Sequence, residues 1–182
     1  MSAHDAILRR RSRPRVTTDS PTDEQLLPLI TAAAGAADHA ALRPWRLIAL
    51  RGDARHRLGE ALVAASGLQL ADAERLAAKP LRAPLLLALV VRHKPSFKVT
   101  DWEQDAAASG VAHYLSLLLD EAGWGVMWRT GGHVRSEPVR RVHGLADNEQ
   151  LLGWLYVGGV VDGESGPASK NAVDARALLT SL

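Results

Sequence analysis

The chain has 182 residues and no cysteine. Disulfides, thiolate metal ligands, iron–sulfur clusters and a cysteine nucleophile are therefore all excluded. Long hydrophobic runs are absent, because the longest apolar stretch, residues 84–91, is far shorter than the roughly 20 residues that cross a bilayer. A signal-peptide pattern is lacking too, since the apolar residues 6–8 come before the basic residues 9–11. We therefore expect a cytoplasmic protein with no membrane partner.

A large excess of charge of one sign is also absent. Lys and Arg number 22, Asp and Glu number 20, and the formal net charge is +2 at pH 7. This balance provides no general attraction for nucleic acid, so no nucleic-acid partner is expected. The composition, 47% hydrophobic and 23% charged, is typical of globular proteins and excludes a disordered chain. At roughly 150 residues per domain, the length predicts a single domain over residues 1–182.

Apolar residues repeat with helical spacing in some segments and form short continuous runs in others. Residues 84–91 are apolar on both faces, which indicates a central strand covered by helices on each side. Strands interleaved with helices favour a layered α/β or α+β architecture. The expected strands are residues 45–50, 84–91, 124–128 and 151–158, and the expected helices are residues 3–10, 21–34, 54–65, 70–78, 101–122 and 137–143.

Capping residues predict where several of these helices begin. Ser20, which a proline follows, and Asp53 are expected to be N-caps. Thr100 and Glu103 have the spacing of a capping box at the start of the longest helix. Ser136 is expected to cap the helix over residues 137–143.

The end of the chain, residues 160–182, is first polar, with glycine, serine and proline, and then apolar at residues 173–179. These apolar residues have no evident place in the sheet of their own chain. We therefore expect residues 160–182 to form a tail that docks on a partner subunit.

Common nucleotide-binding and hydrolase motifs are missing, because no G-x-G-x-x-G, P-loop or G-x-S-x-G occurs. The seven histidines lack metal-ligand spacing, so no metal site is expected. Asp101 and Glu103 are better explained as favourable charges at a helix N-terminus than as an acid–base pair. The sequence therefore contains no recognisable catalytic dyad.

Three polar patterns remain as candidates for a binding site. Arg10, Arg11 and Ser12 can grip a phosphate, because two guanidinium groups and a hydroxyl form short charge-assisted bonds with its oxygens. The alternative interpretation of this cluster is a solvated basic patch. The second pattern lies at residues 38–45 and can equally be an ordinary loop before a strand. The third lies at residues 128–131 and can equally be an ordinary strand end.

Taken in order, six motifs resemble those of the FMN-dependent nitroreductase family, and in particular its short branch of putative NAD(P)H nitroreductases, whose chains are of about this length. The resemblance covers nearly the whole chain, and the order and spacing of the motifs carry it. The motifs are I-L-x-R-R-S at residues 7–12, P-T-x-E-Q-L at 21–26, A-x-D-H-x-x-x-x-P-W at 36–45, R-A-P-L at 82–85, W-E-Q at 102–104 and W-R-x-G at 128–131.

This resemblance implies a three-layer α-β-α fold of the α+β class, with a mixed or antiparallel sheet between helices. It implies an intertwined homodimer with two FMN sites at the subunit interface. It also implies an oxidoreductase that uses NAD(P)H to reduce nitro compounds, quinones or similar small-molecule acceptors by ping-pong hydride transfer through the flavin. No catalytic side chain is implied, because the flavin carries the chemistry.

The resemblance also assigns cofactor-binding residues. One group would hold the FMN phosphate and the pyrimidine side of the flavin, one residue would reach the flavin from the other subunit, and a third group would complete the pocket. These are, in that order, Arg10, Arg11 and Ser12; His39; and Trp128, Arg129 and Thr130. Gly35 stands where relatives can place a flavin-contacting arginine, so that contact is not transferred, and Arg43 is a candidate to replace it.

Two other functions are compatible with these residues. The same scaffold can oxidise a small biosynthetic intermediate. Measuring nicotinamide oxidation with and without a nitroaromatic acceptor distinguishes this activity from nitroreduction. Residues 9–15 can instead serve a non-catalytic regulator that binds flavin or nucleic acid. In the nucleic-acid case, binding weakens steeply with salt because counterions are released.

Overall fold

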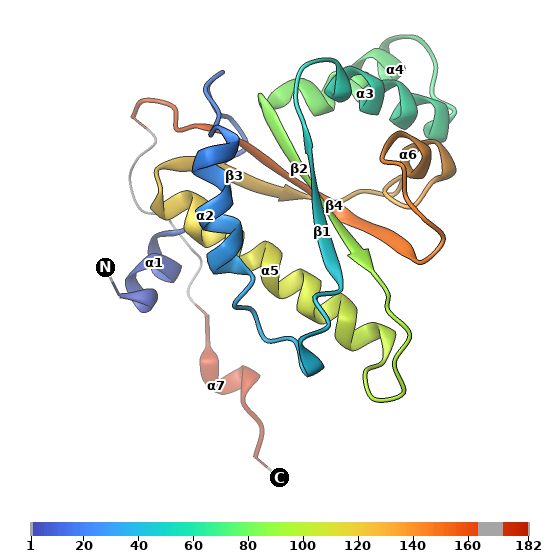
Figure 1. The fold of residues 1–182 in the computed structure, drawn as a ribbon. Helices are drawn as coiled ribbons and strands as arrows, with labels where there is room; N and C mark the ends of the chain where they lie inside the picture. Colours follow the sequence, from blue (N-terminus) through green and yellow to red (C-terminus); the bar gives the residue numbers. More distant parts are fainter. Residues whose placement is uncertain (1, 164–172, 182) are drawn as a thin grey trace.

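The structure is a computed structural model that describes residues 2–163 and 173–181 (Figure 1). Its strands are β1 (Trp45–Leu50), β2 (Leu85–Arg92), β3 (Trp124–Arg129) and β4 (Glu149–Gly159). Its α-helices are α1 (Ala3–Arg9), α2 (Asp23–Ala33), α3 (Asp53–Ser66), α4 (Leu70–Ala77), α5 (Asp101–Glu121), α6 (Glu137–Val142) and α7 (Ala175–Leu178). Two 3₁₀ helices, η1 (His39–Ala41) and η2 (Lys79–Arg82), lie before β1 and β2. None of the helices described is long and apolar enough to cross a membrane.

The four strands form one sheet in the order β1-β2-β4-β3, and each neighbouring pair is antiparallel. β2 lies inside the sheet and is buried from Leu85 to Val91, which confirms the central strand predicted from its apolar sequence. Because the strands that neighbour each other are antiparallel and helices cover the sheet, the fold is α+β.

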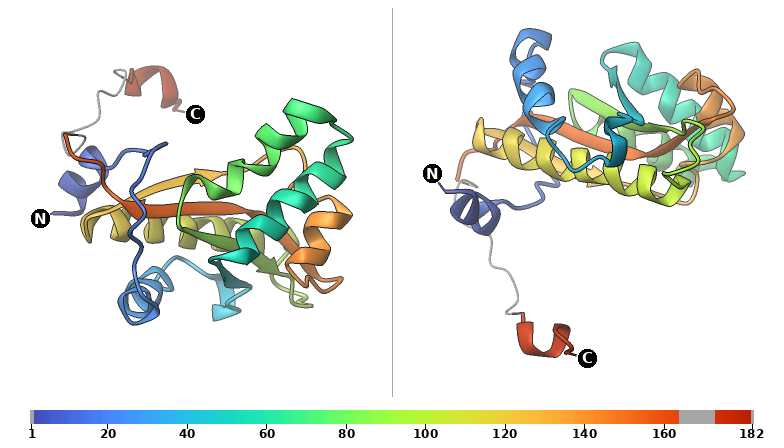
Figure 2. Two further views of the ribbon diagram at one scale, coloured as in Figure 1. Left: turned by 90° about the horizontal axis from the view of Figure 1, so that it is seen from above. Right: turned by 60° about the horizontal axis from the view of Figure 1, so that its bottom comes forward.

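Helices cover both faces of the sheet, as two views of the ribbon show (Figure 2). On one face, Leu85 and Leu87 pack in a cluster with residues of α2 and α5. On the other face, Leu86 and Ala88 pack in a second cluster with residues of α3, α4 and α6. The alternation of side chains along β2 therefore produces the three α-β-α layers that were predicted.

An irregularity in β4 decides which residues face the second cluster. The pairing of β2 with β4 shifts between Leu89 and Val90, opposite Gly153, whose φ is +134°. Regular alternation would place Leu151 and Trp154 on opposite faces of the sheet. The extra residue lets both side chains join the cluster below α3, α4 and α6.

Two of the predicted helix starts are wrong. α2 begins after Thr22, whose hydroxyl accepts from the N–H of Gln25 while Gln25 Oε1 accepts from the N–H of Thr22 at 2.9 Å. The hydroxyl of Ser20 is used elsewhere, because it accepts from Arg51 Nη1 at 2.8 Å. α3 follows Gly52 rather than Asp53, since Asp53 already lies in the first helical turn.

The capping box of Thr100 and Glu103 at the start of α5 is confirmed. Ser136 is the N-cap residue of α6, as predicted, but its hydroxyl donates to the carbonyl of His133 at 2.7 Å instead of accepting from a helix N–H.

Residues 10–19, here called the N-terminal arm, connect α1 with α2 across the edge of the sheet. The N–H of Arg13 donates to the carbonyl of Val126 at 3.0 Å, and the N–H of Thr17 donates to the carbonyl of Gly159 at 2.9 Å. Because Gly159 pairs with Trp124, the arm runs antiparallel to β3. The residues that precede Arg13 therefore approach the carboxyl-terminal half of β3.

The predicted tail is described only in part, since residues 164–172 and 182 lie outside the described residues. In α7 and beside it, Val173, Leu178 and Leu179 are 72%, 77% and 79% exposed. These side chains are not covered by the described residues of the same chain, and docking of the tail on a partner subunit stays a prediction.

Candidate functional site

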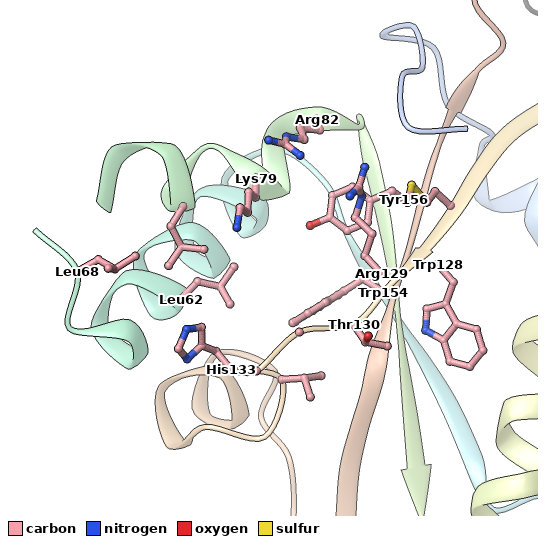
Figure 3. A pocket seen from close by; sticks show the side chains of 15 residues that line it. Leu62, Leu68, Lys79, Arg82, Trp128, Arg129, Thr130, His133, Trp154 and Tyr156 are labelled. Atoms are coloured by element: carbon pink, nitrogen blue, oxygen red, sulfur yellow. The ribbon is translucent and has the colours of Figure 1, made fainter. Parts of the chain in front are cut away.

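A pocket of about 640 Å³ lies between the sheet at β3 and β4 and the helices α3, α4 and η2 (Figure 3). The loop after β3 closes it on one side. Its lining residues are Leu62, Leu68, Leu76, Lys79, Arg82, Met127, Trp128, Arg129, Thr130, Gly131, Gly132, His133, Val134, Trp154 and Tyr156. A volume of this size is typical of sites for cofactors and small molecules.

Two aromatic side chains of β4 form the floor of this pocket. Trp154 is 3% exposed and Tyr156 is 6% exposed. The indole N–H of Trp154 donates to Nε2 of His143 at 3.0 Å. Burial raises the pKa of Tyr156, although the charges of Arg129 and Arg82 oppose this effect. The phenol is therefore neutral at physiological pH, and the floor carries no charge.

Arg129 extends from the end of β3 over this floor. Its guanidinium carbon lies 5.3 Å from the centre of the Tyr156 ring, a cation–π contact. Its Nε is buried and has no hydrogen-bond partner among the described residues. A buried donor without a partner is costly, so this atom is suited to an acceptor on a bound ligand.

The pocket is positively charged. Lys79 and Arg82 stand at its mouth on η2, and Arg129 stands over its floor, whereas no lining residue is acidic. No sequence motif predicted Lys79, Arg82, Trp154 or Tyr156 as site residues. Arg82 lies in the R-A-P-L motif, but nothing in the local sequence places that motif beside β4, which is far away along the chain.

The structure brings Arg129 and Thr130 to the wall of the pocket, as predicted. Trp128 also contributes to the lining, but alternation along β3 turns its indole to the opposite side of the strand (Figure 3). There its ring meets the ring of His113 on α5 edge to face, with centroids 5.2 Å apart.

Arg10, Arg11 and Ser12 lie at the start of the N-terminal arm. Arg10 is the C-cap of α1, Arg10 and Arg11 are half-buried, and Ser12 is exposed. The next residue, Arg13, pairs with Val126, which directly precedes the pocket residue Met127. The arm therefore approaches the strand that forms the pocket wall, although its residues do not line the pocket itself.

His39 lies elsewhere in the protomer, on η1. Its Nδ1 is 3.1 Å from Oε1 of Glu103 in the first turn of α5. The ten residues from Glu103 to His113, the contact of Trp128, correspond to about 15 Å of helix. His39 is thus remote from the pocket of its own chain.

The loop that carries His39 has an unusual backbone. Ala40, Ala41 and Arg43 have φ values of +61°, +50° and +47°, in the left-handed region that non-glycine residues rarely adopt. Asp38 helps to hold this conformation, because its carboxylate accepts from the N–H of Arg43 at 2.6 Å. Lys94 Nζ adds a bond to the carbonyl of Leu42 at 2.6 Å. Strain of this kind is concentrated at functional sites in proteins.

No group of three or more His, Asp or Glu side chains with metal-binding geometry occurs in residues 2–163 and 173–181.

The chain belongs to the nitroreductase family, whose family model matches residues 7–159. A curated relative from Escherichia coli, named "Putative NAD(P)H nitroreductase YdjA", is 31% identical over 163 residues, which are 87% of this chain and 88% of YdjA.

Solved structures share the fold. A nitroreductase-like family protein from Bacillus cereus has a TM-score of 0.85 at 22% identity, covering 100% of this chain and 96% of that protein. The FMN and NADPH-dependent nitroreductase NfnB from Sphigopyxis sp. strain HMH has a TM-score of 0.75 at 21% identity, covering 100% of this chain and 99% of NfnB. The predicted nitroreductase-like fold is therefore confirmed.

Proposed function

We propose that the protein is an FMN-dependent oxidoreductase that uses NAD(P)H to reduce nitro compounds, quinones or similar acceptors by ping-pong exchange. Family membership and the names of YdjA and NfnB support this class of reaction. The observation that carries the proposal is the pocket at β3, where the buried Nε of Arg129 has no hydrogen-bond partner among the described residues and lies above an aromatic floor.

The residues present suit FMN, which combines a planar ring system with a phosphate. Trp154 and Tyr156 offer an apolar surface for the ring, and Arg129 Nε offers a donor for an oxygen or nitrogen at its polar edge. Arg10, Arg11 and Ser12 would hold the phosphate, because the arm brings two guanidinium groups and a hydroxyl to the adjacent strand. Thr130 would complete the same side of the site, with Trp128 beside it in the lining and its indole turned to the other side of β3 (Figure 3).

When bound, FMN would supply the hydride transfer between the nicotinamide and the acceptor. Arg129 would stabilise negative charge at the polar edge of the ring, since a cation held beside a developing charge lowers its energy. The buried floor would exclude water from one side of the ring. No acidic or nucleophilic side chain is required of the protein.

The active form is proposed to be a homodimer with two FMN sites at its interface. His39 supports this arrangement, because it lies too far from the pocket of its own chain to contact a ligand there. In the dimer, the strained loop would present His39 to the flavin of the partner subunit. The exposed apolar residues of the tail, Leu178 and Leu179, would be covered by the same partner.

The direct test is titration of the purified protein with FMN, followed by flavin absorbance and fluorescence. Arg10→Ala combined with Ser12→Ala is expected to lower FMN affinity at least tenfold, since two charge-assisted bonds to a phosphate contribute roughly 1.5–3 kcal/mol each. Arg9→Ala is the matched control, because Arg9 is an exposed cation at the end of α1. A protein that neither contains nor takes up FMN would refute the proposal, and unchanged affinity in the double variant would place the phosphate elsewhere.

A further inference from the structure

Within the proposed function, we propose that the electron acceptor is a planar aromatic molecule with an anionic group, such as an aromatic carboxylate, and that Lys79 and Arg82 bind this group. The inference rests on FMN occupying the site formed by the arm and Arg129. It adds a class of substrate that neither the family nor the fold specifies.

The two cations act together because of the helix that carries them. η2 is a 3₁₀ helix over Lys79–Arg82, and residues three apart in such a helix are eclipsed on one side. Lys79 and Arg82 therefore lie on the same side of η2, at the mouth of the pocket (Figure 3). Pro80 between them is buried, which anchors η2 and holds both side chains at this edge.

Within the described part of the chain, no acidic residue neutralises these cations. No carboxylate of the described residues lies within 4.0 Å of either cation, and none lines the pocket. This contrasts with other arginines of the protein, such as Arg46 and Arg51, which are paired with Glu149 and Asp23. The mouth of the pocket consequently carries two positive charges that attract an anion.

The rest of the pocket is suited to an apolar planar group. Leu62 and Leu76 are 8% and 7% exposed, and Leu68 adds to the same wall. Figure 3 shows Leu62 and Leu68 on one side of the pocket and Trp154 on the other. With the flavin ring on the Trp154 side, as proposed above, an aromatic acceptor would stack between the flavin and the leucine wall, while its anionic substituent reaches Lys79 and Arg82 at the mouth.

Because Lys79 and Arg82 are exposed, their contribution is selectivity rather than high affinity. An exposed ion pair is worth up to about fivefold in binding, and two such contacts act on the same anionic group. The expected signature is therefore a preference for the charged member of a pair of acceptors that have the same shape.

The test compares 4-nitrobenzoate with 4-nitrobenzamide as acceptors for the FMN-loaded enzyme. The ratio of the two kcat/KM values is expected to favour the anion about tenfold at low salt and to fall toward one in 0.5 M NaCl, where exposed charges are screened. Lys79→Gln and Arg82→Gln should each lower the ratio about threefold to fivefold. Arg57→Gln, which removes an exposed cation of α3 outside the pocket, should leave the ratio unchanged.

Rates are expressed per bound FMN, and the FMN dissociation constant of each variant is measured separately. A ratio near one in the wild type would overturn the proposal. So would loss of FMN from the Lys79 and Arg82 variants, because the two cations would then belong to the cofactor site.

A second arm varies the donor, comparing NADH with the uncharged 1-benzyl-1,4-dihydronicotinamide. If the substitutions change only this donor preference, the cations serve the diphosphate of the nicotinamide dinucleotide and the proposal is wrong. A protein that never binds FMN would refute the proposed function itself, so the two failures are distinguishable.

Discussion

The indole N–H of Trp154 donates to Nε2 of His143 at 3.0 Å, and Nδ1 of the same imidazole is 2.7 Å from the carbonyl of Val139. The carbonyl can only accept, so Nδ1 carries the proton and Nε2 has a free lone pair for the indole. Both rings are buried. This pair joins α6 to the floor of the pocket, and it requires a neutral histidine.

The His143 pair predicts a dependence of stability on pH. Burial lowers the pKa of His143 below its ordinary 6.5, whereas the unfolded chain keeps the ordinary value. The unfolded state therefore binds the proton more readily as the pH falls below 6.5, and stability declines down to the lowered pKa. Between pH 7.5 and 5.5 the wild type should lose more stability than His143→Gln, measured by urea denaturation.

Glutamine can still accept from the indole through its amide oxygen, but it does not titrate. His56→Gln is the matched control, because His56 is exposed on α3, and it should follow the wild type. Equal pH profiles for wild type and His143→Gln would contradict this account.

Glu149 predicts a second effect at lower pH. Its carboxylate accepts from Arg46 Nε and Nη2 at 2.8 Å each and from Arg92 Nε at 2.7 Å, and these bonds hold its pKa at about 2. The stability they provide is complete above the ordinary pKa of 4.5 and is lost as the pH falls toward 2. Glu149→Gln should cost about 2 kcal/mol at pH 7 in urea denaturation, and the difference should shrink below pH 4.5.

The control for Glu149 is Glu137→Gln. Glu137 is 69% exposed and its contact with Arg141 is 3.6 Å long, so its loss should cost less than about 0.5 kcal/mol. Equal costs for the two substitutions would show that burial of Glu149 does not matter.

Gly158 tests the position of the N-terminal arm. A Cβ at this position would lie 2.8 Å from the carbonyl oxygen of Thr17 and 2.7 Å from a methyl group of Val16. Gly158→Ala should therefore push the arm from the sheet and lower FMN affinity several-fold, measured by flavin fluorescence. Gly110→Ala, whose Cβ would meet Ala36 at a tolerable 3.4 Å, should retain wild-type affinity. Full FMN affinity in Gly158→Ala would mean that the arm does not hold the cofactor.

Gly153 tests the irregularity in β4. Its φ of +134° is strained for any other residue, and a Cβ would lie 2.6 Å from the carbonyl oxygen of Arg129. Gly153→Ala should destabilise the fold by about 2 kcal/mol or more in thermal or urea denaturation. Gly132→Ala has open space around its Cβ and no positive φ, so it should be nearly neutral. A neutral Gly153→Ala would show that β4 can shift its register freely.

Local patterns predicted most secondary structure correctly. The central position of β2 followed from residues that are apolar on both faces, and the capping box of Thr100 and Glu103 followed from two side chains three residues apart. The start of α2 was wrong because Ser20 is bound by Arg51, a residue of a distant segment. Capping patterns consider only neighbouring residues, so they cannot predict a hydrogen bond from a distant segment.

The sequence by itself determined the layers, the absence of thiol chemistry and, through its ordered motifs, the family. These properties depend on residue types and short spacings, which a chain carries before it folds. Tertiary structure alone decided that Lys79, Arg82 and Arg129 line one pocket, that His143 accepts a hydrogen bond from Trp154, and that His39 is remote from that pocket. The pairing of β2 with β4 and the packing of α3, α4 and α6 on the sheet bring these residues together, and such long-range contacts leave no signal in local sequence.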